Sequence, residues 1–167
     1  MISSIGYLDI IRQRMCADQC AVTDERIGSM PGVVGYRAQM RALAKMHIFA
    51  VAAQADRVDE KCLRGFVDDV VNLALARKGT WRGMQTGLIV LPILVTKSAD
   101  AAATALTQKA YRLNLAGFAA MAQPAVVDVQ ASKVWTFRGT RLWGYAYNSL
   151  IKQKYNNYLP DPTPLSD

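Results

Sequence analysis

The sequence predicts an α/β or α+β fold: a three-layer sandwich with a mixed, mostly parallel sheet flanked by helices, in the order α-α-β-α-β-α-β-β-α. Two almost wholly apolar runs, residues 46–54 and 88–96, have the composition of strands covered on both faces. Helical patterns alternate with these runs, which is typical of parallel strands joined by crossover helices. A hairpin pattern around residue 130 adds an antiparallel strand.

The first 45 residues are expected to form a helical appendage packed on the sheet. Apolar residues at three- and four-residue spacing predict a helix over residues 4–19. Three glycines and a proline within residues 27–35 indicate a loop. Residues 36–45 again have helical composition and are expected to form a second helix.

The clearest helix pattern follows the first apolar run. Asp56 or Asp59 can cap this helix, and Gly79 can end it. The second apolar run contains Pro92, which cannot donate to a sheet ladder, so we expect a bulge or an edge position there. Asp100 is expected to cap an alanine-rich helix that reaches residue 115.

The C-terminal part is expected to contain a hairpin, a helix and a tail. The hairpin arms are residues 125–129 and 133–137, and the helix covers residues 140–159. Residues 161–167 are rich in proline and are expected to form a mobile tail. With no linker in between, residues 1–160 are expected to form one α/β domain.

Composition excludes several classes of protein. Hydrophobic residues make up 51% of the chain and charged residues 20%, as in ordinary globular proteins. The longest apolar run, residues 87–95, is about half the length that a membrane-spanning helix requires. The N-terminus lacks the basic and apolar regions of an export signal. We therefore expect a cytoplasmic protein that has no membrane association and needs no cofactor.

The cysteines are expected to be small buried hydrophobic residues. Cys16, Cys20 and Cys62 are an odd number in a chain without an export signal, which argues against disulfides. Together with His47 they provide the ligand count of a structural zinc site. Their spacing matches no zinc motif, so we favour buried cysteines and a hydrogen-bonded core histidine.

The hairpin raises the possibility of a metal-dependent enzyme. Asp128 and Lys133 are a carboxylate and a lysine of the kind that a divalent-metal nuclease uses, and Asp56, Asp59 or Asp100 would supply further ligands. The restriction-endonuclease-like pattern places an acidic residue two positions before the lysine, where this chain has an alanine. We favour a structural interpretation, in which Asp128 and Lys133 flank the turn and form a cross-strand ion pair.

Positive charge is concentrated near the C-terminus. The chain has a net charge of +7, and residues 101–160 contain seven lysines and arginines but a single acidic residue. Such a concentration favours an acidic partner. Two segments interleave basic and aromatic residues and provide the candidate binding residues: Trp81, Arg82, Arg138, Arg141, Trp143, Tyr147, Lys154, Tyr155 and Tyr158.

These features predict a non-catalytic intracellular binding or assembly module. The basic, aromatic face of the last helix would bind a protein partner or a second copy of the chain, with at least one of Tyr145, Tyr155 and Tyr158 accessible. Nucleic-acid binding through the same face is an alternative, because stacking and phosphate neutralisation use the same residue types. A divalent-metal-dependent nuclease or phosphodiesterase built on Asp128 and Lys133 is the second alternative.

Overall fold

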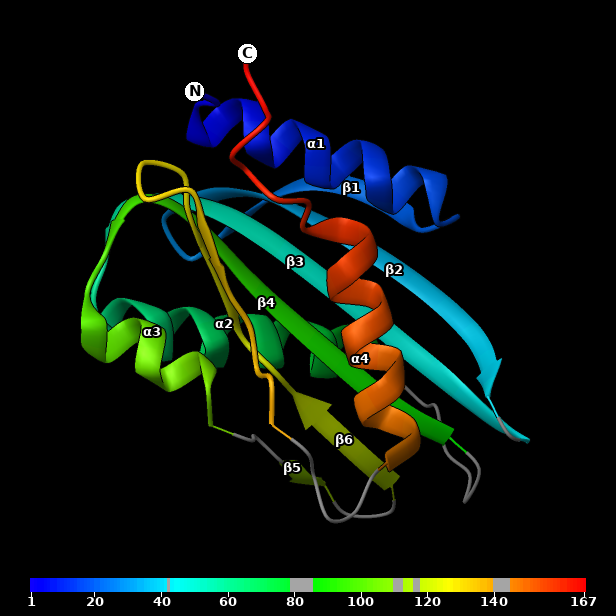
Figure 1. The fold of residues 1–167 in the computed structure, drawn as a ribbon. Helices are drawn as coiled ribbons and strands as arrows, with labels where there is room; N and C mark the ends of the chain where they lie inside the picture. Colours follow the sequence, from blue (N-terminus) through cyan, green and yellow to red (C-terminus); the bar gives the residue numbers. More distant parts are fainter. Residues whose placement is uncertain (42, 79–85, 110–112, 116–117, 140–144) are drawn as a thin grey trace.

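The structure is a computed structural model that describes residues 1–41, 43–78, 86–109, 113–115, 118–139 and 145–167 (Figure 1). Its elements are, in chain order, α1 (Ser4–Ala17), β1 (Ala21–Ile27), β2 (Met30–Arg41), β3 (Ala44–Val58), α2 (Glu60–Lys78), β4 (Thr86–Ala99), α3 (Ala101–Thr107), β5 (Leu113–Leu115), β6 (Phe118–Ala122), β7 (Ala125–Asp128), β8 (Lys133–Trp135) and α4 (Tyr145–Tyr158).

The strands form one mixed sheet, in the order β1-β2-β3-β4-β6-β5. β4 also pairs with β7 beyond the end of β6, and β7 pairs with β8. The parallel pairs β3–β4, β4–β6 and β4–β7 all involve β4, whereas the other pairs are antiparallel. The predicted mixed sheet with flanking helices is confirmed, but the parallel part is confined to the neighbours of β4.

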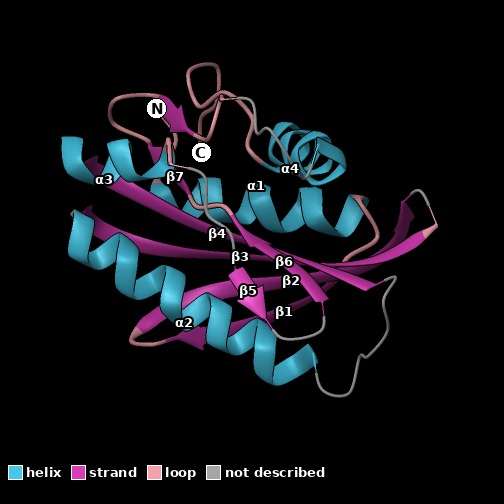
Figure 2. Ribbon diagram, turned by 90° about the horizontal axis from the view of Figure 1, so that it is seen from below, coloured by secondary structure: helices cyan, strands magenta, loops and turns pink. Residues whose placement is uncertain are grey.

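Helices cover both faces of this sheet. Figure 2 shows α1 and α4 on one side of the strands and α2 on the other. The α3 residues Ala103 and Leu106 belong to the same apolar cluster as the α2 residues. Along β3, Ile48 and Ala50 belong to the apolar cluster that contains α1 and α4 residues, whereas Phe49 and Val51 belong to the cluster that contains α2 and α3 residues. Alternate strand residues point to opposite faces, so a strand buried on both sides is apolar at every position.

The expected loop over residues 27–35 and helix over residues 36–45 are wrong. Apart from residue 42, which lies outside the described residues, these residues form the end of β1, a turn, β2 and the start of β3. Gly28 has a φ of 60° in the turn, but the other two glycines allow close packing within a strand. A Cβ on Gly32 would lie 2.8 Å from a backbone oxygen of β3, and a Cβ on Gly35 would lie 2.7 Å from the sulfur of Met15 in α1.

Pro92 lies in the central strand β4, at the point where neither β6 nor β7 pairs with it. Gly87 to Val90 pair with β6 and Ile93 to Thr96 pair with β7. The backbone oxygen of Val90 accepts a hydrogen bond from the N–H of Gln123, so the nitrogen of Pro92, two residues on, points to the same side. The break between β6 and β7 therefore accommodates the proline without an edge position.

The helix ends follow the sequence signals in part. Asp59 caps α2 as expected, because its carboxylate accepts a hydrogen bond of 2.7 Å from the N–H of Cys62. The helix expected to reach residue 115 ends at Thr107, and residues 113–115 form β5. The Asp100 side chain makes no capping hydrogen bond and instead forms an ion pair with Arg57 at 3.0 Å.

The two chain ends lie side by side (Figure 1). The carboxylate of Asp167 accepts a hydrogen bond of 3.0 Å from the backbone N–H of Ser3 and one of 2.8 Å from its hydroxyl. The hydroxyl of Tyr7 donates to the backbone oxygen of Pro160 over 2.6 Å. Pro160 and Asp167 are thus hydrogen-bonded to α1 and to its N-cap residue. None of the helices in the described part of the chain has the length and apolar character needed to cross a membrane.

A buried polar network fixes α4 to α1 and β2. Lys154 of α4 is 2% exposed, and its ammonium group lies 2.5 Å from the carboxylate of Asp18, the residue that ends α1. The same carboxylate accepts hydrogen bonds from the hydroxyl of Tyr158 and from Arg37 of β2, the latter at 2.7 Å. One carboxylate therefore joins α1 and β2 to α4, which is far away in the sequence.

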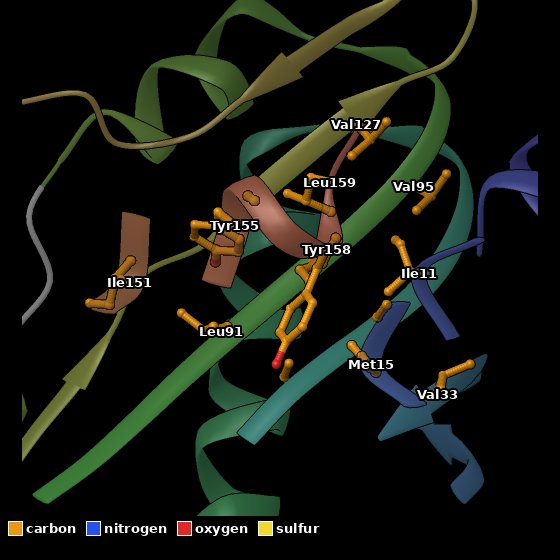
Figure 3. Close-up of a cluster of buried hydrophobic side chains, with 14 of the residues drawn as sticks. Ile11, Met15, Val33, Leu91, Val95, Val127, Ile151, Tyr155, Tyr158 and Leu159 are labelled. Carbon is orange, nitrogen blue, oxygen red and sulfur yellow. The ribbon is translucent and has the colours of Figure 1, made fainter. Parts of the chain in front are cut away.

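Apolar packing surrounds this network. Tyr158 is completely buried, and Figure 3 shows its ring between Leu91 of β4 and the α1 residues Ile11 and Met15. A buried tyrosine removes roughly 150–250 Å² of surface from water and needs a partner for its hydroxyl. Asp18 provides that partner, so the polar network and the apolar core both hold α4 in the same place.

The network also shifts the pKa values of its members. Burial raises the pKa of Asp18, but hydrogen bonds from Lys154 and Tyr158, together with the charge of Arg37, outweigh burial and leave the pKa below its ordinary value of 3.8. Burial and the nearby Asp18 carboxylate raise the pKa of Tyr158, and burial raises that of Cys20. Asp18 is therefore ionised at neutral pH, while the hydroxyl and the thiol keep their protons.

We expect Asp18→Asn to lower the free energy of unfolding by about 3 kcal/mol, because Lys154 is then buried without its anion. Combining Asp18→Asn with Lys154→Met removes both charges and should recover at least about 1 kcal/mol of that loss. Urea unfolding measures both changes, with Asp9→Asn on the exposed side of α1 as the control. An Asp18→Asn variant as stable as the control would show that the pair does not hold α4.

The same pair gives the protein an acid-sensitive stability. Because the pKa of Asp18 is lower in the folded protein than the ordinary value of 3.8, its contribution is complete above that value and is lost as the pH falls through the folded pKa. We therefore expect the stability difference between the native chain and Asp18→Asn to narrow as the pH is lowered from about 6 to about 2. Urea unfolding across this range tests the expectation, and a difference that stays constant would contradict it.

Candidate functional site

The structure describes some of the predicted binding residues but not all of them. Trp81, Arg82, Arg141 and Trp143 lie outside the described residues. The remaining five are Arg138, Tyr147, Lys154, Tyr155 and Tyr158, and only Arg138 is exposed.

The expectation that Lys154, Tyr155 and Tyr158 form an accessible face is wrong. Lys154 is 2% exposed, Tyr155 4% and Tyr158 0%. The hydroxyl of Tyr155 donates to the backbone oxygen of Gln123, so this side chain is also bonded inside the protein. The half-buried Tyr147 lies with its hydroxyl against Gly87 of β4, and burial raises its pKa. These residues attach α4 to the sheet.

A cleft lies between α4 and the chain segment that starts in the β7–β8 turn. We call it the α4 cleft; its volume is about 730 Å³, within the range of small-molecule sites. One wall is formed by β8 and the residues around it: Ser132, Lys133, Val134, Trp135, Thr136 and Arg138. The other wall and one end are formed by α4, the chain after it and the residue that follows α3: Tyr155, Asn156, Leu159, Asp161, Pro162 and Gln108.

A second hollow of about 380 Å³ extends the cleft along α4. It shares Thr136, Arg138, Tyr155 and Asn156 with the first hollow and adds Phe137, Ile151 and Lys152. The two hollows therefore form one concave surface, with Arg138 at the junction.

The cleft is cationic. Lys133, Arg138 and Lys152 line it and are all exposed. Within the described part of the chain, none of these three side chains forms a salt bridge, because the ion pairs present use other lysines and arginines. The carboxylate of Asp161, also in the lining, accepts a hydrogen bond of 2.8 Å from the N–H of Thr163, which lowers its pKa. Three cations thus face one anion that already has a backbone partner.

Aromatic side chains accompany these cations. Trp135 and Phe137 are half-buried, and the ammonium group of Lys133 lies 5.7 Å from the ring centre of Trp135. The sequence pattern assigns Lys133 to a catalytic site or to a cross-strand ion pair, and Lys152, Trp135 and Phe137 are not among the predicted binding residues. The missed signal is the close spacing of Lys133, Trp135, Phe137 and Arg138 along one extended arm.

Asp128 shapes the turn that presents this arm. Its carboxylate accepts hydrogen bonds from the backbone N–H groups of Ala131 at 2.8 Å and Ala99 at 3.1 Å. Asp128 and Lys133 are partners in the β7–β8 register, as expected, but no salt bridge joins them. The predicted cross-strand ion pair is therefore wrong, and Asp128 instead stabilises the turn.

The remaining candidate metal ligands are His47 and the three cysteines. The ring Nδ1 of His47 lies 2.8 Å from the hydroxyl of Tyr36, as expected for a core histidine. The expectation of buried cysteines is wrong for Cys16, which is exposed, whereas Cys20 and Cys62 are partly buried. Among the described residues, no three histidine, cysteine, aspartate or glutamate side chains gather in a way that could hold a metal ion.

A double-mutant cycle separates the two interpretations of Asp128. We expect Asp128→Ala to reduce stability by about 1–3 kcal/mol, because two backbone N–H groups lose their acceptor. Lys133→Ala should change stability by less than about 0.5 kcal/mol, and the coupling between the two changes should be close to zero. Chemical denaturation of the four proteins measures these values, and a coupling above about 0.5 kcal/mol would restore the cross-strand ion pair.

Comparisons with known proteins give no match: no protein-family model fits the sequence, and neither a curated protein nor a solved structure is significantly similar to the chain.

Proposed function

We propose that this protein is a non-catalytic binding module that docks an acidic partner protein in the α4 cleft. The observation that carries the proposal is the combination of a concave surface with Lys133, Arg138 and Lys152, exposed cations whose charge no described carboxylate neutralises through a salt bridge. Such a surface attracts anions over a distance and desolvates them within the cleft. The half-buried Trp135 adds the kind of residue that anchors protein interfaces.

The alternative of an enzyme has less support. Asp128, the carboxylate on which a metal-dependent site would depend, is already hydrogen-bonded to two backbone N–H groups. Asp59 caps α2, and Asp100 pairs with Arg57. These carboxylates have structural partners, so a metal-dependent site at Asp128 has little support from its neighbours.

The proposal differs from the expectation based on sequence in the surface that it uses. The inner face of α4 is occupied by the core, so the binding surface consists of its outer residue Lys152 and the arm that carries Lys133 and Arg138. Self-association is one form of the proposal, in which the acidic surface belongs to a second copy of the chain. Sedimentation of the protein alone tests that form.

Binding of fluorescein-labelled poly-L-glutamate tests the proposal. Arg138→Glu combined with Lys152→Glu should weaken binding at least about tenfold, equivalent to about 1.4 kcal/mol, because both changes reverse charges in the cleft. The control combines Lys45→Glu with Lys61→Glu, which makes the same change in net charge at exposed positions outside the cleft. It should change the affinity by less than about threefold, since exposed distant charges are screened by salt.

Fluorescence anisotropy at several salt concentrations gives the affinities. Equal weakening by both pairs of substitutions would mean that net charge, and not the cleft, attracts the polymer. Binding of oligo(dT) that requires Arg138 and Lys152, without binding of poly-L-glutamate, would replace the acidic protein by single-stranded nucleic acid. That outcome would use Trp135 and Phe137 for base stacking. Absence of binding to both polymers would contradict the proposal that the protein is a binding module.

A further inference from the structure

The wall of the α4 cleft that carries Lys133 is the edge of a strand. Ser132 to Thr136 are five consecutive residues, and all of them line the cleft. Side chains of a strand alternate between its two faces, so a strand that faced the cleft with one side would contribute every second residue. The unbroken run indicates that β8 turns its edge, including its backbone, toward the cleft.

This edge has no strand beside it in the described part of the chain. β8 pairs with β7 through Lys133, Val134 and Trp135 and with no other strand. In an antiparallel pair, every second residue of an edge strand directs its N–H and C=O groups away from its partner. One backbone group just after β8 already has a side-chain partner. The Nε2 group of Gln108 donates a hydrogen bond of 2.8 Å to the backbone oxygen of Thr136.

The far edge of the sheet offers no comparable site. β1 is the edge strand there, and it carries Asp24 and Glu25. Asp24 forms an ion pair with Arg12, and Glu25 forms one with Arg77. The carboxylates of that edge are already paired, whereas β8 lies beside three cations that form no salt bridge in the described structure.

We propose that the occupant of the α4 cleft is an extended acidic segment of a partner polypeptide, which adds to the sheet as a strand beside β8. This inference rests on the proposed function and specifies its ligand. Backbone hydrogen bonds to β8 supply affinity, and alternate side chains of the segment supply specificity, as in other cases of strand addition. Acidic side chains on one side of the segment meet Lys133, Arg138 and Lys152. Its other side chains contact the aromatic surface around Trp135.

The short length of β8 fits this role. Three residues with a lysine at the start make a poor template for edge-to-edge aggregation. A segment held by only a few backbone hydrogen bonds needs additional attraction from charge, and the cleft supplies it. The edge is therefore selective for acidic segments.

Two matched ligands test strand addition separately from charge attraction. The first is a labelled octapeptide of alternating threonine and glutamate, and the second is a peptoid that carries the same side chains on its nitrogen atoms and has no backbone N–H. We expect the peptide to bind at least about tenfold more tightly than the peptoid. Binding of the peptide should slow amide hydrogen exchange in residues 132–136. The substitution Arg138→Glu should weaken peptide binding, whereas the control substitution Lys61→Glu should not.

The outcomes distinguish this inference from the function on which it rests. Equal affinities for peptide and peptoid, both dependent on Arg138, would overturn strand addition and leave an anion-binding cleft in place. Binding of oligo(dT), without binding of the peptide or the peptoid, would overturn the inference that the ligand is a polypeptide segment. No binding of any of these ligands, together with no binding of poly-L-glutamate, would overturn both the inference and the proposed function.

Discussion

The buried contact between Lys154 and Asp18 is the constraint on which the rest of this structure depends. It brings a cation of the last helix to the end of the first helix, and Arg37 and Tyr158 complete the set of partners around one carboxylate. A buried charge without its partner costs several kcal/mol, so α4 can lie against the sheet in one register only. The contact therefore turns the inner face of α4 into core and fixes which of its residues remain outside.

The α4 cleft is a consequence of this placement. One wall is the outer side of a helix whose inner side is fixed, and the other is a hairpin arm whose turn is held by Asp128. Both walls are thus attached to β4, α4 through the apolar cluster in Figure 3 and the arm through β7. A surface built on fixed elements presents its cations in a defined geometry, and such preorganisation lowers the entropic cost of binding.

The sequence predicted elements whose signals are local and missed features that depend on distant contacts. The apolar runs of β3 and β4, the cap of α2 and the β7–β8 hairpin follow from composition and turn residues, and they are confirmed. β2 was mistaken for a loop and a helix because Gly32 and Gly35 resemble turn residues until α1 and β3 are seen against them. Lys154 and Tyr158 were assigned to the surface because no local pattern identifies Asp18, 136 residues before Lys154, as their partner. The sequence shows that the C-terminal part is rich in lysine and arginine, but it does not show which of these side chains lie in the core and which line the cleft.

The most direct test of the central claim is an amide-resolved NMR titration of the protein with poly-L-glutamate. The claim is that the interior holds Lys154 and Tyr158 while recognition occurs in the cleft beside them. It predicts shifts at residues 132–138 and at Lys152, with the amides of α1 and the side-chain signals of Lys154 unchanged. Shifts centred on Lys154 and Tyr158, or spread evenly over the exposed lysines and arginines of the whole surface, would contradict it.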